Sequence, residues 1–343
     1  MQTGSWRSCC GQVRNRRWRP LDTQNGRRCS SQVRVSQAAT AAAAASPTAT
    51  IPPVSSRLAA TSFFPVPHKF VLGLRSITAA EWLQRDHNLA LDLAYKAELL
   101  DSALEKRHVV GEDAASIPAQ QELLSLIRSN LNQYHAVDVF PMSTIDEPAI
   151  AAAGRCVQED LMIVERRGAT LTEWTLTAGC VCFPSRWRLA DKLGRSLVDV
   201  HGPVPGLNER LQGPITEFFD RLKPGELVTR MNSAIMDDAA LQQFSADSPS
   251  TDQMNNKREA RGGQYAEALL LRMERQTLRR LEKTDAIVFT IKTHQMRLQD
   301  VAKTPSFGRR VLRHYQSLRD TPMDGYKTDV AAFCDSLGSL LRS

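Results

Sequence analysis

The sequence predicts an α+β protein, in which helices precede and follow an antiparallel sheet along the chain. Helical periodicity dominates the stretch after residue 65 and again the C-terminal tail, while period-2 strand patterns gather between them. No G-x-G-x-x-G follows a strand pattern and no G-x-x-x-x-G-K-[ST] occurs, so a nucleotide-binding parallel sheet is not indicated. With 343 residues, 42% of them hydrophobic, the chain is long enough to bury a substantial core.

Residues 1–64 differ in composition from the rest and are predicted to be an organelle transit peptide or a disordered tail. They contain nine arginines and a single acidic residue, Asp22, and they are rich in Ser and Ala. The predicted destination is the mitochondrion, with the plastid as the alternative. Beyond residue 64 the chain carries 35 basic and 36 acidic residues, so it lacks the charge of a nucleic-acid-binding protein. No apolar run approaches the ~18 residues that span a membrane.

The first two helices are predicted from periodicity and capping. Apolar residues at helical spacing cover residues 76–107, where Thr78 and Glu81 have the T-x-x-E spacing of a capping box. A second helix covers residues 118–134 and opens on a proline, which suits a first turn. Residues 136–160 are expected to be mostly loop.

Strand patterns then begin. Residues 160–167 and 169–183 flank Gly168, which predicts a hairpin that ends before a proline. Two short helices are expected after it, over residues 189–197 and 208–222, and the second must start a new turn at its internal proline.

The second half of the sheet is predicted from two further runs. Residues 226–237 and 285–298 are strand patterns, whereas residues 265–281 stay ambiguous because their Ala, Leu and Arg favour helix. The polar residues 245–263 are expected to form a surface loop. The tail, residues 307–343, is predicted to form two helices.

The four cysteines beyond residue 64 form no C-x-x-C pair, which excludes a disulfide scaffold and an iron–sulfur framework. Cys180 and Cys182 have period-2 spacing, so we expect buried free thiols on one face of a strand. A zinc site made of these two cysteines and His201 is the weaker alternative, because C-x-C is a poor zinc spacing and no fourth ligand is apparent.

The stretch "SLVDVHGPVPGL" surrounds one histidine, His201, with the stiffest and loosest residue types. Proline fixes φ and glycine tolerates φ > 0, so we expect the imidazole on a defined, non-helical corner. A simple turn that happens to follow a histidine is the other interpretation.

Four sequence blocks between His68 and Leu298 carry a resemblance: "CFPSRWRLADKLGRSL", "HGPVPGL", "RMN…DD" and "RMERQTLRRLEKTDAIVFTIKT". In this order and spacing the chain resembles the heme-dependent oxidative N-demethylase family, alpha-subunit-like proteins long classed as a domain of unknown function. The resemblance implies a PAS-like antiparallel sheet with inserted and flanking helices that holds a heme b. It also implies oxidative removal of a methyl group from a small methylated amine.

The resemblance divides the chain into a domain over residues 65–300 and C-terminal helices over residues 301–343. Within the domain it implies a helical part, residues 65–135, and a PAS-like sheet, residues 155–300.

Three residues carry the predicted site. His201 matches the histidine of the H-x-P-V-P-G block, and we predict it as the heme-iron ligand because imidazole ligates iron. Arg275 and Gln276 match the E-R-Q-T-L block as cofactor-binding residues; Arg275 would anchor a propionate or orient substrate, with a surface pair to Glu274 as the alternative. Asp199 would be the acceptor for the second nitrogen of His201, or else would face solvent.

The sequence departs from the family pattern at two positions. Ser233 stands where the family usually has Trp after R-x-N, and His294 stands where it usually has Tyr. If either faced the pocket, the substrate would differ, and His294 is a rival iron ligand.

The implied reaction consumes O₂ and two electrons and releases formaldehyde. Because the chain has neither a dinucleotide motif nor cluster cysteines, we predict a separate flavin/iron–sulfur reductase or ferredoxin-like electron donor, with residues 245–263 as a docking element. Two other functions stay open: a non-catalytic PAS-like protein that senses heme or another ligand, and an organellar interaction protein that binds no heme.

Overall fold

A computed structural model of the chain describes residues 72–141, 146–168, 173–202, 204, 207–244, 268–321 and 330–343. The chain divides into two units, Met1–Ala45 and Ser46–Ser343, and every described residue belongs to the second. The predicted transit segment and the predicted docking loop therefore lie outside the described residues. Among the helices described, none is both long and apolar enough to cross a membrane.

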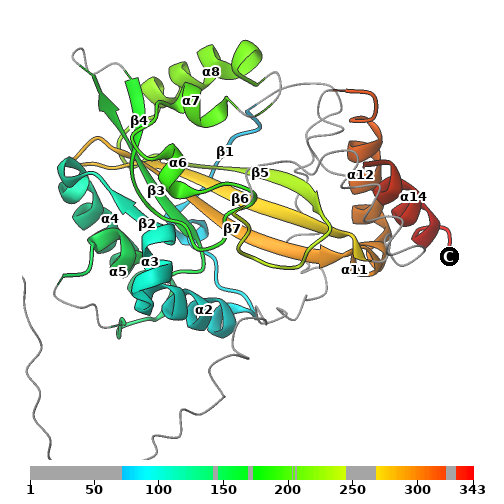
Figure 1. Cartoon of the computed structure of the whole chain (residues 1–343), viewed down its shortest axis with the longest axis horizontal. Helices are drawn as coiled ribbons and strands as arrows, with labels where there is room; N and C mark the ends of the chain where they lie inside the picture. The colour runs from blue at the N-terminus through cyan, green and yellow to red at the C-terminus, as the bar shows by residue number, and fades with distance from the viewer. Residues whose placement is uncertain are drawn as a thin grey trace, which may run out of the picture. The chain divides into compact units, whose positions relative to one another are not determined.

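Within this part of the chain, seven strands form one antiparallel sheet in the order β1-β5-β6-β7-β3-β4-β2 (Figure 1). The strands are β1 (Arg75–Ser76), β2 (Val110–Glu112), β3 (Asp160–Arg167), β4 (Glu173–Cys180), β5 (Leu227–Met236), β6 (Leu270–Arg280) and β7 (Ile287–Arg297). Five long strands form the centre, and the helical connection between β4 and β5 packs on one side of it. The predicted α+β class, an antiparallel sheet with inserted and flanking helices, is confirmed.

The helices form three groups around the sheet (Figure 1). The first group is η2 (Ala79–Glu81), α2 (Leu89–Asp101), α3 (Ala103–Val109), η3 (Ala114–Ser116), α4 (Ile117–His135) and α5 (Ala149–Gly154). The inserted group is α6 (Leu189–Lys192), α7 (Leu197–His201) and α8 (Leu207–Arg221). The C-terminal group is α11 (Leu298–Ala302), α12 (Pro305–Gln316) and α14 (Val330–Leu340).

The two faces of the sheet carry different helices. We define the inner face of the sheet as the face on which Val228, Leu278 and Ile291 pack against α6 and α8. The outer face is the opposite one. At one end of it α2, α4 and α5 cover the hydrophobic residues of β3 and β4, and at the other end α11, α12 and α14 cover those of β5 and β6. Because side chains alternate along a strand, neighbouring residues belong to different faces.

The β3–β4 hairpin forms as predicted, with Gly168 at a positive φ of 85°. However, β4 ends at Cys180, three residues before the predicted end. The carboxylate of Asp160 accepts the backbone N–H groups of Cys182, at 2.8 Å, and of Phe183, at 3.0 Å. Those donors are therefore no longer available to a neighbouring strand.

The ambiguous residues 265–281 contain a strand, β6. Every residue of β6 pairs with β5 or β7, from Leu270 to Arg280. Sheet pairing on both sides overrides the helical preference of its Leu and Arg residues.

The single helix predicted over residues 76–107 is wrong. The capping box exists, since the Thr78 N–H donates to Glu81 at 2.9 Å, but it caps only the short helix η2. The chain then leaves helical geometry until residue 89. The N–H groups of Gln84 and Asp86 donate to side chains at 2.9 and 3.1 Å, the carboxylate of Glu159 and the amide of Gln158, rather than to carbonyls one turn back.

Candidate functional site

His201 is the last residue of α7, so the predicted non-helical corner is corrected. Gly202 keeps a helical backbone, with φ of −47°. The helix forms because the Ser196 hydroxyl accepts the N–H of Asp199 at 3.2 Å and caps its first turn. The Asp199 carboxylate in turn accepts the Ser196 hydroxyl at 2.9 Å and is exposed, so it serves this cap.

A hydrogen bond joins α7 to α8, the helices on either side of the Pro/Gly segment. The side-chain amide of Asn208 donates to the carbonyl of Val198 at 2.9 Å. The prolines and the second glycine of the corner lie outside the described residues. The hydrogen bond fixes the helix that carries His201 against the helix that follows it.

The environment of His201 keeps its imidazole neutral. Burial, together with the positive charges of Lys192 and Arg230, lowers the pKa of His201 to about 4. A hydrogen bond to the backbone of Leu197 acts in the other direction. At neutral pH the ring is therefore unprotonated, which is the form that ligates a metal.

A set of polar side chains lies on the inner face of the sheet, which the inserted helices cover. Arg230 on β5 pairs with Gln276 on β6, so both side chains lie on this face. Glu274 is the centre of the set. Its Oε1 accepts Nε of Arg272 at 3.2 Å, and its Oε2 accepts the amides of Gln276 and Asn232 at 3.3 and 3.4 Å.

The charges of this set fit a ligand that carries carboxylates. Glu274 already pairs with Arg272, whereas Lys192 and Arg230 lie beside the neutral ring of His201. Burial lowers the pKa of Lys192 and of Arg230. The buried Nε of Arg230 has no hydrogen-bond partner among the described residues. A neutral imidazole with surplus positive charge next to it suits heme, whose iron takes a neutral nitrogen and whose propionates are anions.

The structure brings His201 and Gln276 to the inner face and places Arg275 on the outer face. Arg275 is buried, with 6% of its surface exposed. Its guanidinium donates to the backbone carbonyls of Trp82, at 2.9 Å, and Glu81, at 2.6 Å. Burial lowers the pKa of Arg275. These contacts use its donors to hold the segment after η2 against the sheet.

Both departures from the family pattern also lie on the outer face, in one row across the sheet. Ser233 pairs with Met273, and Met273 pairs with His294. The Ser233 hydroxyl is hydrogen-bonded at 3.0 Å to the hydroxyl of Tyr315, a fully buried residue of α12. Because side chains in one row share a face, His294 lies on the side of the sheet opposite His201.

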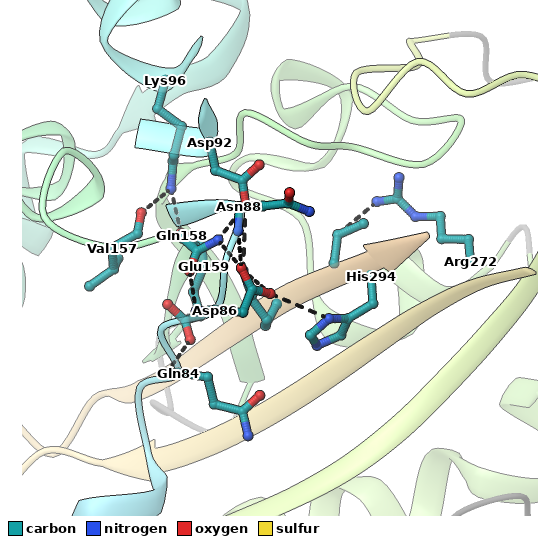
Figure 2. A network of polar contacts seen from close by, with 12 residues as sticks. Gln84, Asp86, Asn88, Asp92, Lys96, Val157, Gln158, Glu159, Arg272 and His294 are labelled. Atoms are coloured by element: carbon teal, nitrogen blue, oxygen red, sulfur yellow. Dashed lines mark hydrogen bonds and ion pairs between the residues drawn. The ribbon is translucent and has the colours of Figure 1, made fainter. Parts of the chain in front are cut away.

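Figure 2 shows the network that holds His294. Its Nδ1 lies 3.7 Å from the carboxylate of Asp86. Asp86 also contacts Nζ of Lys292 at 3.1 Å and accepts the amide of Gln158 at 2.9 Å. Lys292 further contacts Asp92 at 3.4 Å. These residues join the first helical group to β7.

This network predicts a pH dependence of stability. Burial, and next the charge of Lys292, lower the pKa of His294 to about 3, against the attraction of Asp86. Below about pH 6.5 the unfolded chain takes up a proton that the folded chain refuses, so the free energy of unfolding falls as the pH falls towards 3. Between pH 6.5 and 5 this one group contributes a loss on the order of 2 kcal/mol.

We therefore expect His294→Gln to lose less stability than the unaltered protein as the pH falls from about 7 to 5, in urea unfolding. His201 shifts in the same direction, so only the difference between variants isolates His294. His108→Gln, which removes an exposed histidine, is the control. An unchanged pH dependence in His294→Gln would contradict the prediction.

Cys180 and Cys182 are both buried and free, as predicted. They do not share one strand, however, because Cys182 lies beyond the end of β4. Their thiols are hydrogen-bonded to each other, which lowers the pKa of Cys180 and raises that of Cys182. Among the described residues no group of three metal-ligating side chains occurs, so nothing there supports the zinc alternative with His201.

Sequence reasoning missed Lys192 and Arg230, and it considered Glu274 only as a surface partner of Arg275. A signal for two of them exists. In a strand, charged residues at even spacing from a predicted site residue share its face, and Glu274 precedes Gln276 by two positions. Arg230 then follows once β5 and β6 are paired in register. Lys192 lies on a separate helix, and only the tertiary fold places it there.

Comparison with known families agrees with this geometry. The family model described as "Haem-dependent oxidative N-demethylase, alpha subunit-like" matches residues 73–332. The match covers the whole central sheet, the inserted helices and His201. The cofactor of this family is heme, and the inner face presents a neutral histidine and surplus positive charge to such a group. The chain belongs to the heme-dependent oxidative N-demethylase family, alpha-subunit-like.

Proposed function

We propose that the protein is a heme-dependent oxidoreductase that oxidatively demethylates a small methylated amine. The observation that carries this proposal is the neutral, half-buried His201 at the end of α7, beside the positive charges of Lys192 and Arg230. When bound, heme b supplies the activation of O₂ and the oxidation of the N-methyl group. O₂, two electrons and two protons convert the methyl group to formaldehyde and leave water and the demethylated amine.

The chain's own residues have separate tasks in this proposal. His201 ligates the iron, and its hydrogen bond to the Leu197 backbone orients the ring. Glu274 pairs with Arg272 through Oε1, so only its Oε2 is offered to the amine, as a hydrogen-bond acceptor. Among the described residues this oxygen has only long contacts, to Gln276 and Asn232, so we assign it to the substrate amine. The side-chain amide of Gln276 donates to the Glu274 carboxylate at 3.3 Å and holds it in place.

The electrons come from a partner. The sequence contains no dinucleotide-binding motif and no cysteine pattern for a cluster, so a separate flavin/iron–sulfur reductase or ferredoxin-like protein is required. We propose that this donor docks on the chain, with residues 245–263 as a contact segment.

Reconstitution tests the function. The heme-loaded chain with reduced nicotinamide and a panel of secondary and tertiary methylamines is expected to release no formaldehyde, and release is expected to begin when a flavin/iron–sulfur reductase is added. Turnover with reduced nicotinamide alone would contradict the partner. A heme-loaded chain that releases no formaldehyde with any reductase would favour the sensing alternative. A chain that binds no heme would favour the interaction protein.

We also propose a mitochondrial location, with the plastid as the alternative. The many arginines and single acid of residues 1–64 support it. We expect N-terminal sequencing of the protein from its own cells to find a mature chain that begins between about residues 45 and 66. Retention of residues near Met1 would contradict this prediction.

A further inference from the structure

Two basic side chains on different elements act on the His201 ring through their positive charge. Arg230 projects from β5, on the sheet, and Lys192 projects from α6, on the inserted helices. Nζ of Lys192 lies 4.6 Å from the centre of the Trp187 ring, and this contact holds the ammonium beside the indole. Both cations are half-buried and both act on the ring of His201.

Neither cation is neutralised by the described residues. Glu274 attracts both, but its carboxylate already pairs with Arg272 at 3.2 Å. Asp191, the other acid that acts on Lys192, is exposed to solvent. A partly buried cation without a counterion is unfavourable, and an anionic ligand offsets that cost.

The ligand that fits is a group with two carboxylates near a metal-bound nitrogen. Arg binds a carboxylate through two parallel N–H donors, and Lys binds it as a point charge. Arg275, the arginine predicted for this role, already donates to the carbonyls of Trp82 and Glu81. Arg230 has its Nε without a partner among the described residues and lies on the correct face.

We propose that Arg230 and Lys192 bind the two propionate carboxylates of the heme whose iron His201 ligates. This assignment rests on the proposed function, since it requires that the chain bind heme. It gives the two basic side chains one task, which is to neutralise the carboxylates of the cofactor.

The test compares two ligands that differ only at the propionates. The apoprotein is titrated with hemin and with hemin dimethyl ester, and binding is followed by the Soret band. We expect the unaltered chain to bind hemin about 100-fold more tightly than the ester, because each of the two charge-assisted contacts is worth about tenfold. Arg230→Met and Lys192→Met each weaken hemin binding by about tenfold and leave ester binding nearly unchanged. The double variant binds both ligands equally.

Arg279→Met is the matched control. Arg279 is also half-buried and its Nε also lacks a partner among the described residues, but its guanidinium lies 4.8 Å from the Trp82 ring, on the outer face. We expect it to keep the preference for hemin. Arg230→Lys keeps the charge, and an intermediate preference is expected if Arg230→Met does not fold.

Two results are decisive against the assignment. If the variants of Arg230 and Lys192 keep the full preference for hemin over the ester, the propionates bind elsewhere and the heme proposal itself stands. If the unaltered chain binds neither ligand, the proposed function fails and takes this assignment with it.

Discussion

The His201→Ala protein is expected to show no Soret band after reconstitution with heme, under conditions in which the unaltered chain shows one. The imidazole is neutral because burial lowers its pKa to about 4, and the rival ligand His294 lies on the outer face of the sheet. Loss of a residue that orients a metal ligand costs about 10–100-fold in metal affinity, and loss of the ligand itself costs more. We expect heme affinity to fall by more than about 100-fold.

His294→Ala is the control, because it removes a histidine from the outer face. It is expected to keep the Soret band of the unaltered chain. A smaller variant at the first position, His201→Gly, is expected to recover a band when imidazole is added, which separates loss of the ligand from misfolding. If His294→Ala lost the band while His201→Ala kept it, the iron ligand would be on the other face of the sheet.

Most strands of the sheet can be predicted from the sequence because each has an alternating pattern within its own short segment. The hairpin of β3 and β4 has alternating residues on both sides of Gly168, and β7 is equally clear. The strand β6 could not be decided in this way. Its composition is helical, and it is a strand because β5 and β7 pair with it along its whole length. Pairing over such sequence separations is not visible in local periodicity.

The break in the predicted helix 76–107 has the same origin. Its residues have helical spacing, but Glu159 and Gln158, which come more than 70 positions later, take the N–H groups of Gln84 and Asp86. Local propensity is a weak guide where a distant side chain satisfies the backbone.

For the candidate site, the sequence names residues but does not indicate on which face of the sheet each of them lies. The resemblance supplied Arg275 and Gln276 as one block, but two neighbours in a strand point to opposite sides. The same rule explains the two departures from the family. Ser233 and His294 lie in one row on the outer face, where Ser233 contacts Tyr315 of α12. Ser233 therefore belongs to the packing of α12, and His294 belongs to the Asp86 network.

The second large prediction concerns Arg275 and Gln276, which are neighbours on opposite faces of β6. Substituting Arg275 should change stability, and substituting Gln276 should change the Soret band. Arg275→Met leaves the carbonyls of Trp82 and Glu81 without their charged donor. Such hydrogen bonds contribute about 1.5–3 kcal/mol each, so we expect the free energy of unfolding of the apoprotein to fall by about 3 kcal/mol in urea. The Soret maximum of the heme-loaded protein should not move, because this side chain faces away from His201.

Gln276→Met is the matched variant on the other face. Its amide makes one long contact, 3.3 Å to Glu274, so stability should change by less than about 1 kcal/mol. The loss of the amide frees the carboxylate of Glu274 next to the heme site, and we expect a shifted Soret maximum and a higher KM for the amine. If Arg275→Met moved the Soret band and left stability intact, Arg275 would belong to the heme site after all. The two readouts thus decide, residue by residue, which face of β6 holds the cofactor.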